Sequence, residues 1–382
     1  MLKRAVVAGH ICLDIIPHFD HHISLDPGRL YEVGSPTIAT GGAVSNTGMT
    51  MHLLGQPVTL MGKIGDDSFG KSVLDVVRAR APELLSGMAQ SPAVATSYTV
   101  VVNIPGTDRM FLHCPGANAS YSSADVNWPL VADAHLFHFG YPAFMAAMYA
   151  DDACELLAMY ARAKELGVTT SLDPGMPDAA GPAGKVDWQR VLTRLLPSVD
   201  VFMPSADELL YMIDSARFGK GDELSGNELA ELGAKMLAMG VAVAAVKLGK
   251  RGMYIRSAGK ARLEAMGAGR PAALDAWADR ELWFPIFQER CFRGATGAGD
   301  ASIAAFLTAM LRGLSLSDAG TFAAAVGACN VEAPDSLSGI QSWDATMARI
   351  AAVWAKQPLP ALDRGWSLDQ AGIAHGPADK QS

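Results

Sequence analysis

The chain has 382 residues, of which 50% are hydrophobic and 18% are charged, and its formal net charge is −8. This composition predicts a large globular core, and the acidic balance excludes a basic surface for nucleic acid. No apolar run reaches the roughly 18 residues of a membrane span, and five scattered cysteines without a C-x-x-C pair indicate reduced thiols. We therefore expect a cytoplasmic protein that binds neither nucleic acid nor membranes.

Short apolar runs alternate with helical patterns along the chain. The predicted strands are residues 6–8, 58–61, 135–139, 169–173, 199–203 and 241–246, and the clearest helical patterns are 152–166 and 227–239. Continuous apolar strands between helices are typical of a parallel sheet that is covered on both faces. The fold class is therefore α/β, and ligands are expected at the carboxyl ends of the strands.

Two segments, 15–38 and 93–114, break this alternation. The second contains the alternating sequence Ser-Tyr-Thr-Val-Val-Val from position 97. We interpret both segments as strands of a small sheet that forms a lid over the substrate site. An exposed apolar sheet commonly pairs with a second copy, so a homodimer through the lid is expected.

A Gly-Gly turn near the N-terminus leads into a short helix that ends at Gly55. Gly41 and Gly42 allow the backbone to approach a polyol closely, and Asn46 offers a donor and an acceptor to neighbouring hydroxyls. Alternatively, Asn46 is a helix cap and the glycines are ordinary turn residues.

The most informative stretch is Arg-Gly-Ala-Thr-Gly-Ala-Gly-Asp at positions 293–300, which leads directly into an apolar helix. Gly297, Ala298 and Gly299 leave backbone N–H groups accessible at the positive end of the helix dipole, which favours a bound anion. Asp300 would repel that anion unless it accepts a proton. Phosphoryl transfer to an alcohol needs this combination of anion donors and a carboxylate base. The alternative is a glycine-rich turn with a capping Asp.

Together, the Gly-Gly…Asn turn and the Gly-Ala-Gly-Asp helix start resemble the two signatures of the ribokinase-like (PfkB) carbohydrate kinases. The resemblance implies a three-layer α/β/α fold with a mainly parallel central sheet and a small β-sheet lid. It also implies that Asp300 is the catalytic base and that Gly297, Ala298 and Gly299 form the anion hole. ATP and Mg²⁺ would be the cofactors.

The resemblance assigns roles to further residues. The implied substrate-binding residues are Asp14, Gly41, Gly42, Asn46, Arg109 and Asn118. The implied nucleotide-binding residues are Lys247, Gly249, Gly252, Thr296 and Asn330, and Glu208 would organise Mg²⁺ through water. The turn 332–336 resembles the monovalent-cation loop of the family, which implies K⁺.

This chain departs from the family pattern at several positions. Ser205 stands where Asn is usual, which puts its metal and phosphate role in doubt, and Lys247 stands where a small polar residue is usual. The Ala/Gly-rich stretch 258–278 is longer than expected. Glu208 can also be interpreted as a helix N-terminal acid, and Arg109 as a solvated hairpin charge.

We therefore predict one α/β kinase domain over residues 1–358, with the lid segments inserted, and a polar, frayed tail over 359–382. The predicted activity is ATP-dependent phosphorylation of a hydroxyl, expected to be primary, on a small sugar or sugar-like molecule. A nucleoside kinase with Tyr98 or Phe111 stacked on a base, and a sugar-binding regulator that transfers no phosphate, remain as alternatives. A dinucleotide oxidoreductase is disfavoured because no G-x-G-x-x-G follows the first strand.

Overall fold

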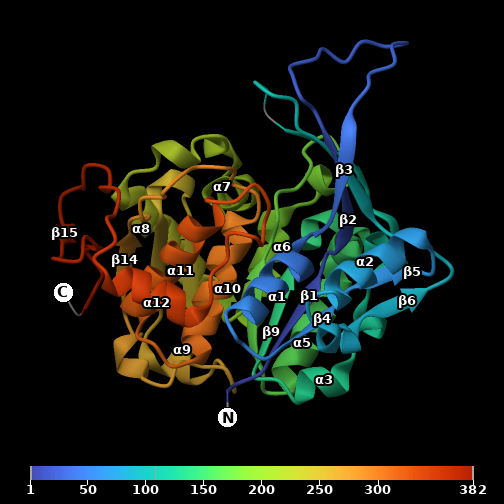
Figure 1. The fold of residues 1–382 in the computed structure, drawn as a ribbon. Coiled ribbons are helices and arrows are strands. Elements are labelled where there is room, and N and C mark those ends of the chain that lie inside the picture. The colour runs from blue at the N-terminus through green and yellow to red at the C-terminus, as the bar shows by residue number, and fades with distance from the viewer. Residues whose placement is uncertain (1, 108, 381–382) are drawn as a thin grey trace.

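The structure is a computed structural model, and it describes residues 2–107 and 109–380. A ten-stranded sheet forms the centre of the body (Figure 1). From one edge to the other its strands are β4 (Val58–Met61), β1 (Ala5–Gly9), β9 (Leu136–Gly140), β10 (Thr169–Asp173), β11 (Val201–Phe202), β12 (Val243–Lys247), β13 (Met253–Ser257), β14 (Glu281–Phe284), β16 (Ala374–His375) and β15 (Ser367–Leu368). The strands from β4 to β12 are parallel, and those beyond β12 are antiparallel.

Helices cover both faces of this sheet, so the predicted three-layer α/β/α fold is confirmed. One apolar cluster contains residues of α5 (Cys154–Glu165), α6 (Trp188–Leu195), α7 (Ala206–Ile213) and α8 (Gly226–Ala238), and the other contains residues of α1 (Ala43–Leu53), α2 (Ser68–Arg78), α10 (Ala298–Leu311) and α11 (Leu316–Asn330). In β1, Val6 and Ala8 belong to the first cluster and Val7 to the second. Successive side chains of a strand point to opposite faces, so a strand that is buried on both faces is apolar throughout.

A second, four-stranded sheet projects from the body (Figure 1). Its strands lie in the order β3 (Gly34–Gly41), β2 (Cys12–His18), β7 (Tyr98–Val102) and β8 (Met110–Cys114). It forms from the two segments in which the sequence departs from strand–helix alternation. We call these four strands the lid. A separate pair, β5 (Lys63–Gly65) and β6 (Ala89–Ser91), lies beside α2 (Figure 1).

The remaining helices are short. They are α3 (Trp128–Ala132), α4 (Ala146–Tyr149), α9 (Lys260–Glu264) and α12 (Trp343–Ala351). The stretch 258–278 contains α9 and packs into the body, because Met266 and Trp277 are fully buried and Trp277 contacts Phe306 of α10. Among the described residues, no helix combines the length and the apolarity that crossing a membrane requires.

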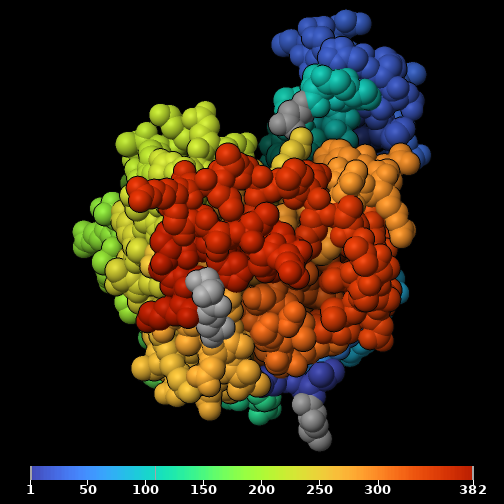
Figure 2. Space-filling model, turned by 90° about the vertical axis from the view of Figure 1, so that its left-hand side faces the viewer, coloured from blue at the N-terminus to red at the C-terminus, as the bar shows by residue number. Residues whose placement is uncertain are grey.

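The prediction of a frayed tail after residue 358 is wrong for the described part of that segment. β16 pairs with β14, and Trp366 packs against Trp283. The buried Asp379 accepts a hydrogen bond of 2.6 Å from Arg280. Figure 2 shows C-terminal segments spread over the face of the body that is visible in that view. The composition of the tail was misleading because two of its charged residues, Asp379 and Lys380, form ion pairs with Arg280 and Asp279 of the body.

Candidate active site

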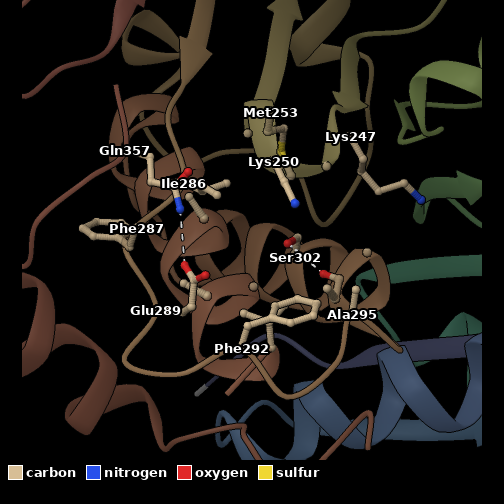
Figure 3. Close-up of a pocket in the computed structure, with 18 residues that line it drawn as sticks. Lys247, Lys250, Met253, Ile286, Phe287, Glu289, Phe292, Ala295, Ser302 and Gln357 are labelled. Atoms are coloured by element: carbon tan, nitrogen blue, oxygen red, sulfur yellow. Dashed lines mark hydrogen bonds between the residues drawn. The ribbon is translucent and has the colours of Figure 1, made fainter. Parts of the chain in front are cut away.

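A cavity of about 420 Å³ lies beside the β12–β13 turn, the loop 285–295 and helices α10 and α11 (Figure 3). Five residues predicted for the nucleotide or the anion hole line it, namely Lys247, Gly249, Gly252, Ala298 and Gly299. Gly297, Thr296 and Asn330 do not line it. Asn330 is fully buried, and its Nδ2 donates to the backbone oxygen of Ser336 at 2.8 Å.

Two residues that the sequence analysis did not single out face this cavity. Lys250 is exposed on the β12–β13 turn, and its ammonium points into the cavity (Figure 3). Phe292 lies below it and is 61% exposed. An exposed aromatic ring and a cation in one cavity suit a ligand with a flat base and phosphates. Lys250 follows a recognisable Leu-Gly turn, whereas no sequence signal marks Phe292.

The start of α10 has the geometry of an anion site. Gly297 is the N-cap residue and has a φ of 75°, in the left-handed region that favours glycine. A Cβ at this position would lie 2.4 Å from the Cβ of Ser336, so a larger residue would displace the neighbouring turn. The backbone N–H groups of this first turn have no partners within the helix and lie at the positive end of the helix dipole, and the N–H of Ala298 donates to the backbone oxygen of Ala295 at 3.2 Å.

Asp300 lies in the first turn of α10 and is 4% exposed. Its Oδ2 accepts a hydrogen bond of 3.0 Å from Asn46 Nδ2, and its Oδ1 accepts one of 3.2 Å from Thr47 Oγ1. The hydroxyl of Tyr141 lies 2.8 Å from both oxygens. Burial raises the pKa of the Asp300 carboxyl above its ordinary value, although Lys247 and these donors oppose the rise.

Lys247 is the centre of a group of acids. Its Nζ lies 3.0 Å from Oδ1 of Asp173 and 3.8 Å from Oε2 of Glu208. Burial, with the nearby Glu208 and Asp300 carboxylates, raises the pKa of Asp173 to about 7, and Lys247 opposes this rise. Burial alone would lower the pKa of Lys247, but the surrounding carboxylates raise it above its ordinary value. The sequence analysis missed Asp173, although it ends a predicted strand at the edge where ligands are expected.

The exceptional Ser205 has a structural role. Its backbone N–H donates to Glu208 Oε2 at 2.5 Å, and its Oγ accepts from the backbone N–H of Glu208 at 3.3 Å, which forms a capping box at the start of α7. Glu208 is therefore an acid at a helix N-terminus, which is the alternative interpretation of this residue. It also faces Lys247.

Asp14 and the two glycines of the Gly-Gly turn meet at the base of the lid. A Cβ on Gly41 would lie 2.3 Å from Oδ2 of Asp14, and a Cβ on Gly42 would lie 2.5 Å from Nδ1 of His10. Cys12 Sγ donates to Oδ1 of Asp14 at 3.3 Å. Burial raises the pKa of Asp14 to about 6. Small residues at both positions therefore keep the backbone close to these polar groups.

Two histidines connect the body to the lid. His10 Nε2 lies 3.4 Å from Nε2 of His113, whose Nδ1 lies 2.9 Å from Oγ1 of Thr99. Burial lowers the pKa of His10 to about 3, so this imidazole is neutral. The ring centroids of His10 and Tyr141 are 6.2 Å apart. Sequence patterns could not reveal this group, because its members come from distant parts of the chain.

Three predicted substrate residues are engaged within the protein. Arg109, directly before β8, contacts Oγ1 of Thr296, next to the residues predicted to form the anion hole. Asn118 is fully buried. Its Oδ1 accepts a hydrogen bond of 3.2 Å from the backbone N–H of Ile11, and its Nδ2 donates to the backbone oxygen of Ile11 at 2.8 Å. Asn46 donates to Asp300, and its Oδ1 accepts from Ser336 Oγ at 2.9 Å.

The fold is similar to that of solved ribokinase-like structures. A solved structure of ribokinase from Arabidopsis thaliana, complexed with ribose and ATP, has a TM-score of 0.69 at 20% identity and covers 91% of this chain and 98% of that one. A fructokinase from Xylella fastidiosa with bound ATP has a TM-score of 0.69 at 19% identity, with 92% and 99% coverage. These likenesses confirm the predicted fold.

The family follows from the sequence comparison. The model of the pfkB family carbohydrate kinases matches residues 2–343, so the chain belongs to this family, as predicted. Fructokinase-1 from Oryza sativa subsp. japonica is 27% identical over 219 residues, which are 56% of this chain and 64% of that protein. The match therefore spans less than two thirds of the length of this relative.

Proposed function

We propose that the protein transfers the γ-phosphoryl group of ATP to a hydroxyl, expected to be primary, of a small sugar or sugar-like molecule. The observation that carries this proposal is the position of Asp300. It follows directly after Ala298 and Gly299, which line the cavity, and it is hydrogen-bonded to α1 and to Tyr141 on the other side. The buried carboxylate of Asp300 thus lies between a cavity that suits a nucleotide and the polar side chains of α1 and Tyr141, which suit a polyol.

The residues present fit Mg-ATP. The cavity offers Lys250 to phosphates and Phe292 to a base, and a buried oxygen of Asp173, Oδ2, has no partner among the described residues. Asp173 and Glu208 would hold Mg²⁺, which is commonly bound by one or two carboxylates plus phosphates and water. Bound Mg²⁺ would neutralise charge on the β- and γ-phosphates.

The predicted K⁺ site does not fit in the same way. In the turn 332–336, Glu332 is paired with Arg349 at 2.6 Å, and Asp335 accepts from the backbone N–H groups of Leu337 and Ser338. We therefore leave K⁺ out of the proposed reaction.

The side chains of this protein perform the remaining steps. Asp14, with the close backbone of Gly41 and Gly42, holds acceptor hydroxyls. The acceptor oxygen bonds to the γ-phosphorus while the bond to the bridging oxygen breaks, ADP leaves, and Asp300 takes the acceptor proton. The N–H groups of 297–299 stabilise the charge on the transferring oxygens. Arg109 reaches from the lid to the anion hole, and a closed lid excludes water. Asn118 is fully buried and positions the backbone at Ile11, so we propose an indirect role for it at the acceptor site.

Mass spectrometry of acceptors after incubation with Mg-ATP tests this function. The panel contains sugars, sugar acids, sugar phosphates and nucleosides. We expect one sugar or sugar-like compound to gain a phosphoryl group. A phosphorylated nucleoside would favour the nucleoside kinase instead, for which the proposed stacking residue Tyr98 is already packed against Phe69 at a centroid distance of 5.3 Å. Sugar binding without any phosphorylated product would favour the regulator.

The lid also supports the predicted homodimer. β8 is an edge strand, and its Phe111 and Leu112 are 57% and 62% exposed. Exposed apolar residues on an unpaired edge favour association with another sheet. We expect the wild-type protein to be a dimer by light scattering and Leu112→Asp to be a monomer. Leu368→Asp, at an equally exposed leucine on the edge strand β15, is the control and should remain a dimer. A dimeric Leu112→Asp variant would show that the lid is not the interface.

A further inference from the structure

The hydroxyl of Tyr141 lies directly against the carboxylate that the proposed function assigns as the base. Its distance to each oxygen of Asp300 is 2.8 Å, while Asn46 donates to Oδ2 and Thr47 donates to Oδ1. Three donors, the amide of Asn46, the hydroxyl of Thr47 and the single hydroxyl proton of Tyr141, therefore face this carboxylate, which is 4% exposed. Because Asp300 is buried and the Tyr141 hydroxyl lies against both of its oxygens, another hydroxyl can reach it only if one of the present donors gives way.

Tyr141 is the donor that is best able to move. Asn46 and Thr47 belong to α1, are 8% and 0% exposed, and are held by the packing of α1 on α10. Tyr141 lies in the loop after β9 and is only partly buried. Its φ of 66° lies in the left-handed region, which is strained for a residue other than glycine. Strain of this kind is concentrated at ligand sites and switch regions.

Tyr141 also lies on the acceptor side of Asp300. Its ring centroid is 6.2 Å from that of His10 and 5.4 Å from that of Phe144. His10 in turn contacts Gly42, one of the residues proposed to hold the acceptor. Tyr141 does not line the nucleotide cavity. Its hydroxyl therefore occupies the side of the carboxylate that an acceptor hydroxyl would approach.

We propose that Tyr141 covers the catalytic carboxylate until the acceptor hydroxyl displaces it, and that this cover keeps Asp300 from activating water against ATP. The inference rests on the proposed function. In the reaction that the cover prevents, a water oxygen bonds to the γ-phosphorus, the bond to the bridging oxygen of ADP breaks, and Asp300 takes a proton from the water. The products are ADP and inorganic phosphate. Tyr141 is thus a positioning residue that protects ATP while no acceptor is bound.

ADP release from Mg-ATP without any acceptor tests this inference. In Tyr141→Phe, a water can replace the lost hydroxyl and bond to both oxygens of Asp300, so we expect acceptor-independent ADP release to rise about tenfold over wild type. The double variant Tyr141→Phe/Asp300→Asn should lose this increase. Tyr160→Phe is the matched control, because its buried hydroxyl donates to the backbone oxygen of Ser171 at 2.8 Å and lies in the core. It should release ADP at the wild-type rate.

The pH profile separates this role from a purely structural one. The hydrogen bond from Tyr141 lowers the pKa of Asp300, so its loss in Tyr141→Phe should raise that pKa and move the acid limb of kcat/KM to higher pH. Lys247 and Asp173, the charged groups that also face Asp300, are unchanged in this variant. Tyr160→Phe should keep the wild-type profile.

Wild-type rates of acceptor-independent ADP release in a folded Tyr141→Phe variant would overturn the inference. If that variant does not fold, Tyr141→Leu provides the same test, because it also removes the hydroxyl and retains an apolar side chain. The acceptor panel decides the proposed function separately. Suppose that the wild-type enzyme phosphorylates an acceptor but neither Tyr141→Phe nor Tyr141→Leu hydrolyses ATP faster than the wild type. The proposed function would then stand, and the proposed role of Tyr141 would be refuted.

Discussion

Replacing Asp300 by Asn is expected to lower kcat by about 10² or more, because an amide cannot accept the proton of the acceptor hydroxyl. The exchange retains the size of the side chain, and Asp300 does not line the cavity proposed for the nucleotide. The affinity for ATP should therefore stay close to wild type. Steady-state kinetics with the identified acceptor, together with calorimetric titration of ATP, measure both quantities.

Asp318→Asn is a suitable control for this variant. Asp318 lies in the first turn of α11, the helix that follows α10, and interacts with Ser315 at the protein surface. It shares the favourable interaction of an acid with a helix N-terminus but lies outside the site. It should retain the wild-type kcat. Wild-type-like turnover in Asp300→Asn would show that Asp300 is not the base.

Replacing Lys247 by Met is expected to destabilise the protein by about 3–5 kcal/mol, because it leaves buried carboxylates without their cation. The Lys247 side chain is 13% exposed and that of Asp173 is 1% exposed. Loss of Lys247 should raise the pKa of Asp173 further above its present value of about 7. When the pKa of a carboxyl is higher in the folded than in the unfolded state, the free energy of unfolding falls as the pH rises from the unfolded pKa to the folded pKa. The penalty should therefore be smaller at pH 5 than at pH 8.

Urea unfolding of Lys247→Met at these two pH values measures the effect. Lys250→Met is the matched control, since Lys250 is an exposed cation only three positions away. It should unfold like the wild type but bind ATP about tenfold more weakly, because the proposed charge-assisted hydrogen bond to phosphate is lost. Equal stability of Lys247→Met and wild type at pH 8 would contradict the proposed role of Lys247 as the cation of this acid group.

Local signals allowed most of the fold and part of the site to be predicted. The two-sided burial of β1 and β12 leaves continuous apolar runs, which sequence patterns show directly. Asp300 could be predicted as the base because a helix start, small residues and an acid are adjacent in the chain. The resemblance to a known family placed Asp14, Gly41 and Gly42, and the structure brings these three together.

Contacts between distant segments could not be predicted in the same way. Tyr141 and Asp300 are 159 positions apart, and Lys247 and Asp173 are 74 apart. Neither pair belongs to a local motif, and a tyrosine after a buried strand indicates nothing about the carboxylate that it will meet. The C-terminal segment was misjudged for a related reason, since its ion pair between Asp379 and Arg280 spans 99 positions.

The most direct test of the proposed reaction is ADP release from Mg-ATP, measured with and without each acceptor of the panel for wild type and Asp300→Asn side by side. We predict that one compound stimulates ADP release by the wild type and that Asp300→Asn, while still binding ATP, loses this stimulation. Equal stimulation in both proteins, or none by any acceptor in a wild-type protein that binds ATP, would contradict phosphoryl transfer with Asp300 as the base.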